Sequence, residues 1–186
     1  MRTATARGNP AKQVGIIFLL SVLLLRAAFA QGYNEIEVKA AFLYHFTSYI
    51  EWPPKAFDSP TAPVVIGVLG RSAILDALRE AVRGKSAQGR AIVVRQVQTA
   101  QEMRQCHILF IPASESRSLP RVLEELDSAP VLVVGEAEGF AQRGGMVNFF
   151  LEQSKVRFEV NPDAAKRASL NISSKLLRLA RVVKSL

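Results

Sequence analysis

The side chains that could act as nucleophiles or bases do not fall into a catalytic pattern. Ser114 and Ser116 flank Glu115, but neither serine lies in a GxSxG motif. The two histidines are His45 and His107, and His107 lies within an apolar run that is typical of a buried strand. We therefore do not expect a Ser-His-Asp arrangement.

Paired carboxylates and metal ligands give no stronger signal. Glu124 and Glu125, and likewise Glu136 and Glu138, are expected on helix or loop surfaces, where no apolar pocket would separate their pKa values. His45 has no second histidine or cluster of carboxylates near it in the sequence. We predict that the protein is not an enzyme and that it holds no metal ion or cofactor.

Three loops that follow apolar runs are the places to look for a ligand: residues 112–116, residues 135–136 and Gly70-Arg71-Ser72. The third loop leads into a predicted helix, where free amides, a hydroxyl and a guanidinium could hold an anion. Its spacing matches neither GxGxxG nor GxxxxGKS/T, the motifs that wrap a diphosphate. A turn with a serine cap explains the same residues.

These loops belong to a succession of apolar runs and amphipathic segments that starts at residue 64. The runs predict strands at Val64–Leu69, Ala91–Val97, His107–Ile111 and Val131–Val134. The segments between them predict helices at 74–82, Thr99–Gln105 and Leu119–Leu126. Strands that are apolar throughout are typical of a parallel sheet covered by helices. We predict a single α/β domain with a doubly wound, mostly parallel sheet and flanking helices.

A C-terminal β-hairpin is predicted at residues 146–160. Val147, Phe149 and Leu151 alternate with more polar positions, and the same alternation resumes after the turn at Gln153-Ser154. The hairpin therefore has one apolar face, and we expect it to form the partly antiparallel edge of the sheet.

Two helices are predicted after the hairpin. Asn161-Pro162-Asp163 provides a cap, a proline at the first helical position and an early carboxylate, which predicts a helix over 162–168. A second helix is predicted from Ser173 or Ser174 to Val183. Its basic face would consist of Lys175, Arg178, Arg181 and Lys184. Such a face meets an acidic partner, an anionic membrane surface or only solvent.

The N-terminal residues have the features of a secretory signal peptide. Arg2, Arg7 and Lys12 precede an apolar run at 14–25, and Ala28-Phe29-Ala30 predicts cleavage between Ala30 and Gln31. An uncleaved anchor is the alternative, but the run is short against the roughly 20 residues that span a bilayer. We predict residues 1–30 as the signal peptide, residues 31–186 as the domain, and a helix over 35–50 that starts it.

Charge and cysteine content narrow the function further. Residues 1–30 contain four of the 24 basic residues and no acid, so half of the net charge of +8 belongs to the predicted signal peptide. Nucleic acid is not an expected partner, because no aromatic residues are interleaved with the basic ones. Cys106 is the only cysteine, so no intramolecular disulfide can form, and we interpret it as a small buried side chain rather than a reactive thiol.

Four further segments are informative when taken together: KAAFLYHFTSYIEWP at Lys39–Pro53, IGVLG at Ile66–Gly70, CHILFIP at Cys106–Pro112, and the long segment Gly144–Arg181. In this order they resemble the YfiR family of periplasmic proteins. The resemblance implies a periplasmic, dimer-forming repressor without chemistry of its own. Such repressors restrain a membrane-bound diguanylate cyclase through its periplasmic sensor domain, upstream of cyclic di-GMP and biofilm formation. An outer-membrane lipoprotein with an OmpA-like, peptidoglycan-binding domain sequesters them.

The resemblance also has departures. Disulfide-bearing members have a cysteine where this chain has Gly67, facing the cysteine that matches Cys106. They have a second pair where this chain has Ala141 and Asn148. Redox control through a disulfide is therefore not expected. Candidate ligand-binding or partner-binding positions are Arg157, Glu159, Asn161, Asn171 and Ser173, for each of which a purely structural role is an open alternative.

The sequence leaves a second function open. The protein would then be a periplasmic small-molecule sensor, or a solute-binding accessory to a transporter or histidine kinase. Its cleft would be formed by the loops after the parallel strands.

Overall fold

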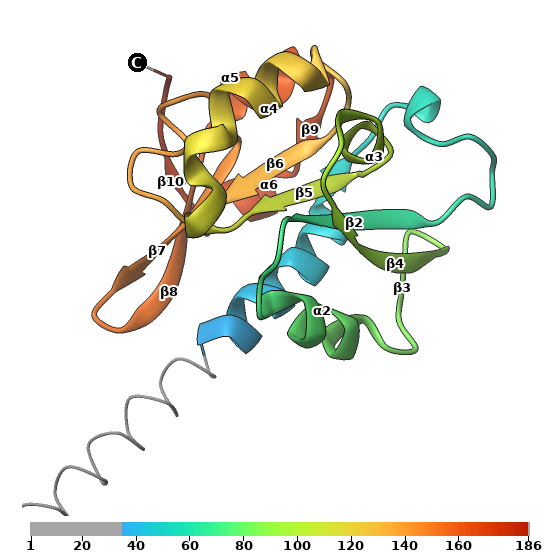
Figure 1. Ribbon diagram of the computed structural model, residues 1–186, viewed down its shortest axis with the longest axis horizontal. Helices are drawn as coiled ribbons and strands as arrows, with labels where there is room; N and C mark the ends of the chain where they lie inside the picture. The colour runs from blue at the N-terminus through green and yellow to red at the C-terminus, as the bar shows by residue number, and fades with distance from the viewer. Residues whose placement is uncertain (1–34, 186) are drawn as a thin grey trace, which may run out of the picture. The chain divides into compact units, whose positions relative to one another are not determined.

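The computed structural model describes residues 35–185 (Figure 1). The predicted signal peptide and its cleavage site between Ala30 and Gln31 lie outside these residues. The described part begins with a helix over residues 35–49 that buries Ala40, Leu43 and Phe46 at steps of three, as the sequence predicts. It ends before the short strand β1 (Ile50–Glu51) and the 3-10 helix η1 (Pro54–Ala56).

An eight-stranded sheet lies at the centre of the described residues, in the order β10-β8-β7-β6-β5-β2-β4-β3. Its strands are β2 (Val64–Leu69), β3 (Ser86–Ala87), β4 (Arg90–Val97), β5 (Ile108–Ile111), β6 (Leu132–Gly135), β7 (Val147–Glu152), β8 (Lys155–Val160) and β10 (Arg181–Val182). The strands from β7 to β4 pair in parallel. The β7–β8 and β3–β4 pairs are antiparallel. The predicted α/β fold with a mostly parallel sheet is confirmed.

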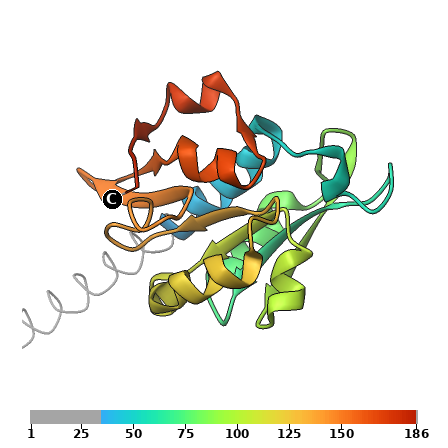
Figure 2. The same ribbon diagram turned by 90° about the horizontal axis from the view of Figure 1, so that it is seen from above.

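Helices cover both faces of this sheet. They are α2 (Ile74–Val82), α3 (Ala100–Arg104), η2 (Ala113–Ser118), α4 (Leu119–Leu126), α5 (Pro162–Arg167) and α6 (Ser174–Leu177). Figure 2 shows α3 and α4 on one side of the sheet, with α5, α6 and the N-terminal helix on the other. All residues of β2, β5 and β6 are buried, because helices pack on both of their faces.

The C-terminal helix predicted up to Val183 is wrong. Helix α6 makes about one turn, and the chain then forms β10, which pairs in parallel with β8. The amide of Val183 donates to the carbonyl oxygen of Val160 at 2.9 Å. The outer edge of β8 offers a ladder to the β-branched Val182 and Val183, and this tertiary pairing overrides the helical pattern. The predicted basic helical face therefore does not form, and the hairpin is not the edge of the sheet.

A second, two-stranded sheet ties the N-terminal segment to the C-terminal part. In it β1 pairs in antiparallel fashion with β9 (Asn171–Ile172), and Ile50 lies opposite Ile172. No pattern in the sequence predicts this pair of strands. No helix within residues 35–185 is long and apolar enough to cross a membrane.

Candidate functional site

The direction of the strand connections changes between β2 and β5. The chain leaves β2 toward β4 on one side, whereas β5 leads to β6 on the other. Ligands of doubly wound sheets bind at such a point, outside the carboxyl ends of the strands. Gly70 follows β2 with φ +67°, and a Cβ built there would lie 2.9 Å from Oε1 of Glu115 in η2. The Glu115 carboxylate therefore lies against Gly70, at the point where the direction of the connections changes.

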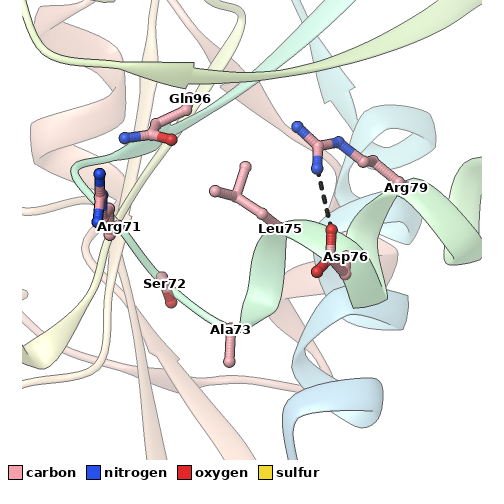
Figure 3. Close-up of a pocket in the computed structure, with 7 residues that line it drawn as sticks. All are labelled: Arg71, Ser72, Ala73, Leu75, Asp76, Arg79 and Gln96. Carbon is pink, nitrogen blue, oxygen red and sulfur yellow. Dashed lines mark hydrogen bonds and ion pairs between the residues drawn. The ribbon is translucent and has the colours of Figure 1, made fainter.

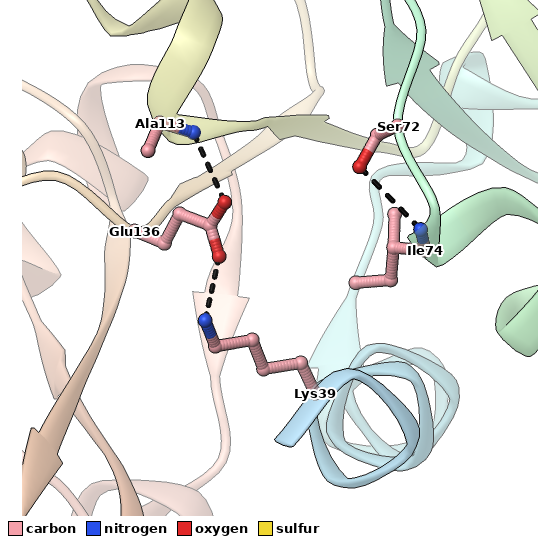
Figure 4. Close-up of polar contacts among 5 residues, drawn as sticks. All are labelled: Lys39, Ser72, Ile74, Ala113 and Glu136. Atoms are coloured by element: carbon pink, nitrogen blue, oxygen red, sulfur yellow. Dashed lines mark hydrogen bonds and ion pairs between the residues drawn. The ribbon is translucent and has the colours of Figure 1, made fainter. Parts of the chain in front are cut away.

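An ion pair joins the N-terminal helix to the same edge of the sheet (Figure 4). Lys39 Nζ lies 2.6 Å from Glu136 Oε2, directly after β6. The other carboxylate oxygen of Glu136 accepts a hydrogen bond from the Ala113 amide at 3.0 Å. The side chains of Lys39 and Glu136 are only 11% and 19% exposed, so both charges are largely removed from water. Glu136 thus connects three segments, and its carboxylate is occupied by protein donors.

Arg71 and Ser72 of the predicted Gly70-Arg71-Ser72 loop line a hollow of about 420 Å³ (Figure 3). Arg71 and Gln96 stand on one side of it, and the first turns of α2 form the other. Ser72 Oγ accepts a long hydrogen bond of 3.4 Å from the Ile74 amide. Two arginines, Arg71 and Arg79, line the hollow. Arg79 on α2 forms an ion pair with Asp76 at 2.9 Å, so the Arg71 guanidinium is the group that would meet an anion. The hollow is open and polar, and could admit a small anion.

A second hollow, of about 170 Å³, lies between α4 and α5. Its walls are mainly apolar, with contributions from Leu126, Val133 and Met146, and Arg167 also lines it. Leu123 and Gly144 both line it and pack closely, since a Cβ built at Gly144 would lie 2.9 Å from Leu123 Cδ1.

The predicted positions Glu159 and Asn161 lie at the base of the hairpin and are buried. Glu159 accepts hydrogen bonds from Asn148 Nδ2 at 3.1 Å and from Gln142 Nε2 at 3.4 Å. Asn161 caps α5 by accepting from the Ala164 amide at 3.0 Å. Its Nδ2 donates to the carbonyl oxygen of Ala141 at 2.8 Å and to Ser185 Oγ at 2.9 Å. Both side chains hold elements together.

The other three predicted positions lie elsewhere. Arg157 is exposed on β8, 3.8 Å from Glu152. Asn171 donates to Glu51 Oε2 at 2.7 Å across the small sheet. Ser173 caps α6 by accepting from the Lys175 amide at 3.2 Å. The five residues therefore do not form one site.

The residues considered for catalysis are also separated. Ser114 is exposed on η2, His45 is exposed on the N-terminal helix, and His107 is buried at the start of β5. Within residues 35–185, no group of three or more His, Cys, Asp or Glu residues is placed to hold a metal ion.

Comparison with known proteins assigns the chain. A family model described as YfiR/HmsC-like matches residues 36–181, from the N-terminal helix to β10. The protein belongs to the YfiR/HmsC-like family. This confirms the resemblance found in the sequence. YfiR/HmsC-like proteins are periplasmic regulators, which supports a regulatory role in the periplasm in general terms.

Solved structures and curated proteins add little to the family assignment. An ABC domain in complex with L-Trp from Streptococcus pneumonia is 13% identical, covering 64% of this chain and 55% of that chain, with a TM-score of 0.48. A conserved domain protein from Vibrio cholerae is 12% identical, with coverages of 64% and 54% and a TM-score of 0.49. CD0873, a substrate binding protein with adhesive properties from Clostridium difficile, is 17% identical, with coverages of 66% and 55% and a TM-score of 0.45. The match spans about half of each of those chains. No curated protein matches the chain.

The two positions where some YfiR/HmsC-like proteins are expected to have a disulfide do face each other. A Cβ built at Gly67 would overlap Cys106 Sγ. Cys106 is a free, buried thiol in this chain. Burial raises the pKa of Cys106 to about 12, so its reactive thiolate form is scarce. Within this YfiR/HmsC-like domain Cys106 is therefore a packing residue.

His107 has a role that the sequence did not reveal. Its Nδ1 accepts a hydrogen bond from the Val65 amide at 3.1 Å, so the neutral ring carries its proton on Nε2. The ring stacks on Phe57 with centroids 4.4 Å apart, and the Trp52 indole donates to the His107 carbonyl oxygen at 3.2 Å. Burial lowers the pKa of His107. In the sequence Trp52 and Phe57 lie close to a double proline. That position does not indicate that their partner in the fold is His107.

Proposed function

We propose that this protein is a non-catalytic regulator that binds and represses the periplasmic sensor part of an inner-membrane signalling enzyme. The enzyme class proposed is a diguanylate cyclase, so that the protein acts upstream of cyclic di-GMP and biofilm formation. The observation that carries this proposal is the YfiR/HmsC-like match over residues 36–181. The proposal includes export with a signal peptide cleaved between Ala30 and Gln31, a homodimer, and release by an outer-membrane OmpA-like lipoprotein.

The polar groups of the domain support a scaffold role. Glu136, Glu159 and Asn161 spend their hydrogen-bonding capacity on neighbouring elements. A rigid domain of this kind can act by presenting a binding surface to a partner protein, and that role requires no catalytic group.

The test is recovery of the partner from membranes. The tagged, exported protein is used to isolate proteins from solubilised inner membranes, and we expect an enzyme with a periplasmic sensor and a cyclase domain. Deleting the gene should raise cellular cyclic di-GMP. Arg157→Ala and Asn171→Ala test the two exposed predicted positions, and Arg104→Ala on α3 is the control. Recovery of no inner-membrane signalling protein, with cyclic di-GMP unchanged, would contradict the proposal.

Two further measurements test the finer parts. N-terminal sequencing of the exported protein should begin at Gln31, and light scattering should give the mass of a dimer. A monomer at micromolar concentration would remove the homodimer from the proposal and leave the repressor role intact.

A small-molecule sensor is the second candidate, and the hollow beside Arg71 supports it. The hollow lies beside the carboxyl ends of β2 and β4, at the edge where doubly wound sheets bind ligands, and on the β4 side of the point of reversal. Titration calorimetry with inorganic phosphate and with small carboxylates tests this function. Binding that Arg71→Gln abolishes, without any membrane partner, would favour the sensor over the repressor.

A further inference from the structure

Exposed apolar side chains and unbalanced positive charge coincide on one part of the molecule. Leu151, Leu179 and Val182 are the large hydrophobic residues found exposed within residues 35–185, at 54%, 69% and 56%. All three lie on residues 151–157 and 178–184, which we call the hairpin-tail surface. Single exposed apolar residues are ordinary, but their concentration in one place marks an interaction surface.

Contacts between side chains join the two segments of the hairpin-tail surface. Arg181 on β10 reaches across β8 to Glu152 at 2.9 Å, and its guanidinium lies 4.4 Å from the centre of the Phe150 ring. Glu152 also lies 3.8 Å from Arg157. Leu179 and Val182 flank Arg181 in the chain, and Leu151 lies opposite Val156 across the hairpin. Glu152, Arg157 and Arg181 lie on one face of these strands, and Leu151, Val156 and Val182 lie on the other. Charged and apolar groups therefore share one edge of the molecule, from the hairpin turn to the end of β10.

The charge of the domain is concentrated on this surface. Residues 31–186 contain 20 Lys or Arg and 16 Asp or Glu. Five of these basic residues and one acid, Glu152, belong to the hairpin-tail surface, which leaves 15 of each sign elsewhere. The basic residues are all exposed: Lys155, Arg157, Arg178, Arg181 and Lys184. The net positive charge of residues 31–186 is thus the charge of the hairpin-tail surface.

We propose that the hairpin-tail surface binds an anionic phospholipid surface. Basic side chains with apolar residues between them suit such a surface, since cations pair with headgroup phosphates while leucine and valine enter the acyl boundary. The hairpin extends away from the sheet in Figure 1 and is a projection. Neither hollow described above includes any residue of the surface. A lipid surface needs no complementary pocket, so it fits this projection better than an acidic protein does.

The assignment is tested with the full exported protein and lipid vesicles. Sedimentation is measured with vesicles of equal parts phosphatidylglycerol and phosphatidylcholine, and with phosphatidylcholine alone. We expect binding only to the anionic vesicles, weakening as salt rises. A triple variant with Lys155→Gln, Arg178→Gln and Lys184→Gln keeps the Arg181 contacts and should bind roughly a hundredfold more weakly, at about fivefold for each charge.

The matched control removes the same charge elsewhere. Lys55→Gln, Arg104→Gln and Arg117→Gln together change three exposed residues outside the surface and should lower binding much less. Leu151→Ser with Leu179→Ser should weaken binding to anionic vesicles while the salt dependence persists. Equal binding to both vesicle types, or an equal loss in the control, would overturn the proposal. Capture by an acidic protein fraction without vesicle binding would overturn it in favour of a protein partner.

Discussion

Gly67 on β2 leaves the space that the sulfur atom of Cys106 occupies. A Cβ at residue 67 would overlap Cys106 Sγ and lie 3.4 Å from two methyl carbons of Val97. Protein interiors are close-packed, so an added methyl group must displace these neighbours. We expect Gly67→Ala to lower the free energy of unfolding by about 1–3 kcal/mol, measured by urea denaturation.

The sulfur atom can be shown to cause this loss. In a Cys106→Ala background, Gly67→Ala should cost less, because the overlapping atom is absent. Strictly additive losses in the double variant would contradict the steric explanation.

A cysteine at residue 67 should restore the disulfide that the family resemblance places here. The Gly67→Cys side chain would start in contact with Cys106 Sγ, so little movement is needed to form the bond. Burial raises the pKa of Cys106 to about 12, so we expect the bond to form during oxidative refolding and only slowly in the folded protein. Thiol titration and mass spectrometry measure it, with Cys106→Ser as the control that cannot cross-link. Two free thiols after oxidative refolding would show that the positions do not meet.

Acid should destabilise the protein through His107. Burial holds the pKa of His107 below its value in the unfolded chain, about 6.5, so the unfolded state binds the proton more tightly. Stability from this group is complete above about pH 6.5 and is lost progressively as the pH falls below that value, through the lower pKa of the folded protein. Protonation of Nδ1 would also set a second donor against the Val65 amide. Arg90 and Asp58 are the charged groups that act on the ring, in opposite directions.

The measurement is urea denaturation at pH 7.5 and at about pH 5. His107→Asn keeps an acceptor, Oδ1, near the position of Nδ1 for the Val65 amide and should show a smaller loss between the two conditions. His45→Gln removes an exposed histidine and should behave as the parent protein does. If His45→Gln flattened the pH dependence instead, the assignment to His107 would be wrong.

The ion pair between Lys39 and Glu136 should matter for stability. Glu136→Gln removes the negative charge that lies 2.6 Å from the largely buried Lys39 ammonium, and we expect it to cost about 1–3 kcal/mol in the free energy of unfolding. The matched control is Glu80→Gln, which breaks the Arg83 pair on α2, where the side chains are 76% and 66% exposed. That change should stay within about 0.5 kcal/mol. Equal effects at the two pairs would mean that burial does not strengthen the first.

Replacing Asn161 should lower the stability of the fold, whereas replacing Asn171 should not. Asn161 is fully buried and caps α5, so Asn161→Ala should cost at least about 0.5–2 kcal/mol. Asn171 is exposed, and its bond to Glu51 faces solvent. Thermal denaturation of both variants measures the difference. A stable Asn171→Ala protein makes any loss of partner binding at that position interpretable.

The sequence predicted the parts of the fold that carry a local pattern. The bounds of β2 and α4 agree with the apolar periodicity, because burial on one or both faces fixes which positions are apolar. The apolar residues between 174 and 183 have the spacing of a helix. The chain forms β10 instead because the edge of β8 is available for strand pairing. β1 and β9 are two residues long, so they have no period to detect.

The site was less predictable because its contacts join distant segments. The loops after β2, β5 and β6 were singled out as places to look for a ligand, and the contacts of Glu115 with Gly70 and of Glu136 with the Ala113 amide bring them together. That Glu136 would meet Lys39, 97 residues away, has no sequence signal. Asn161 and Ser173 were recognised as polar positions at helix starts, and their capping bonds explain them without a partner.

The aromatic contacts of the N-terminal helix affect the order in which parts of the domain can fold. Phe42 and Phe46 pack on Phe149 and Phe158, which are synthesised much later. The first helix therefore lacks its partners until the hairpin exists, and contacts so distant in the chain slow folding. Until the hairpin has been made, the first helix has no aromatic surface to pack on, and an unpacked N-terminal segment is the form that a narrow transport channel can admit first.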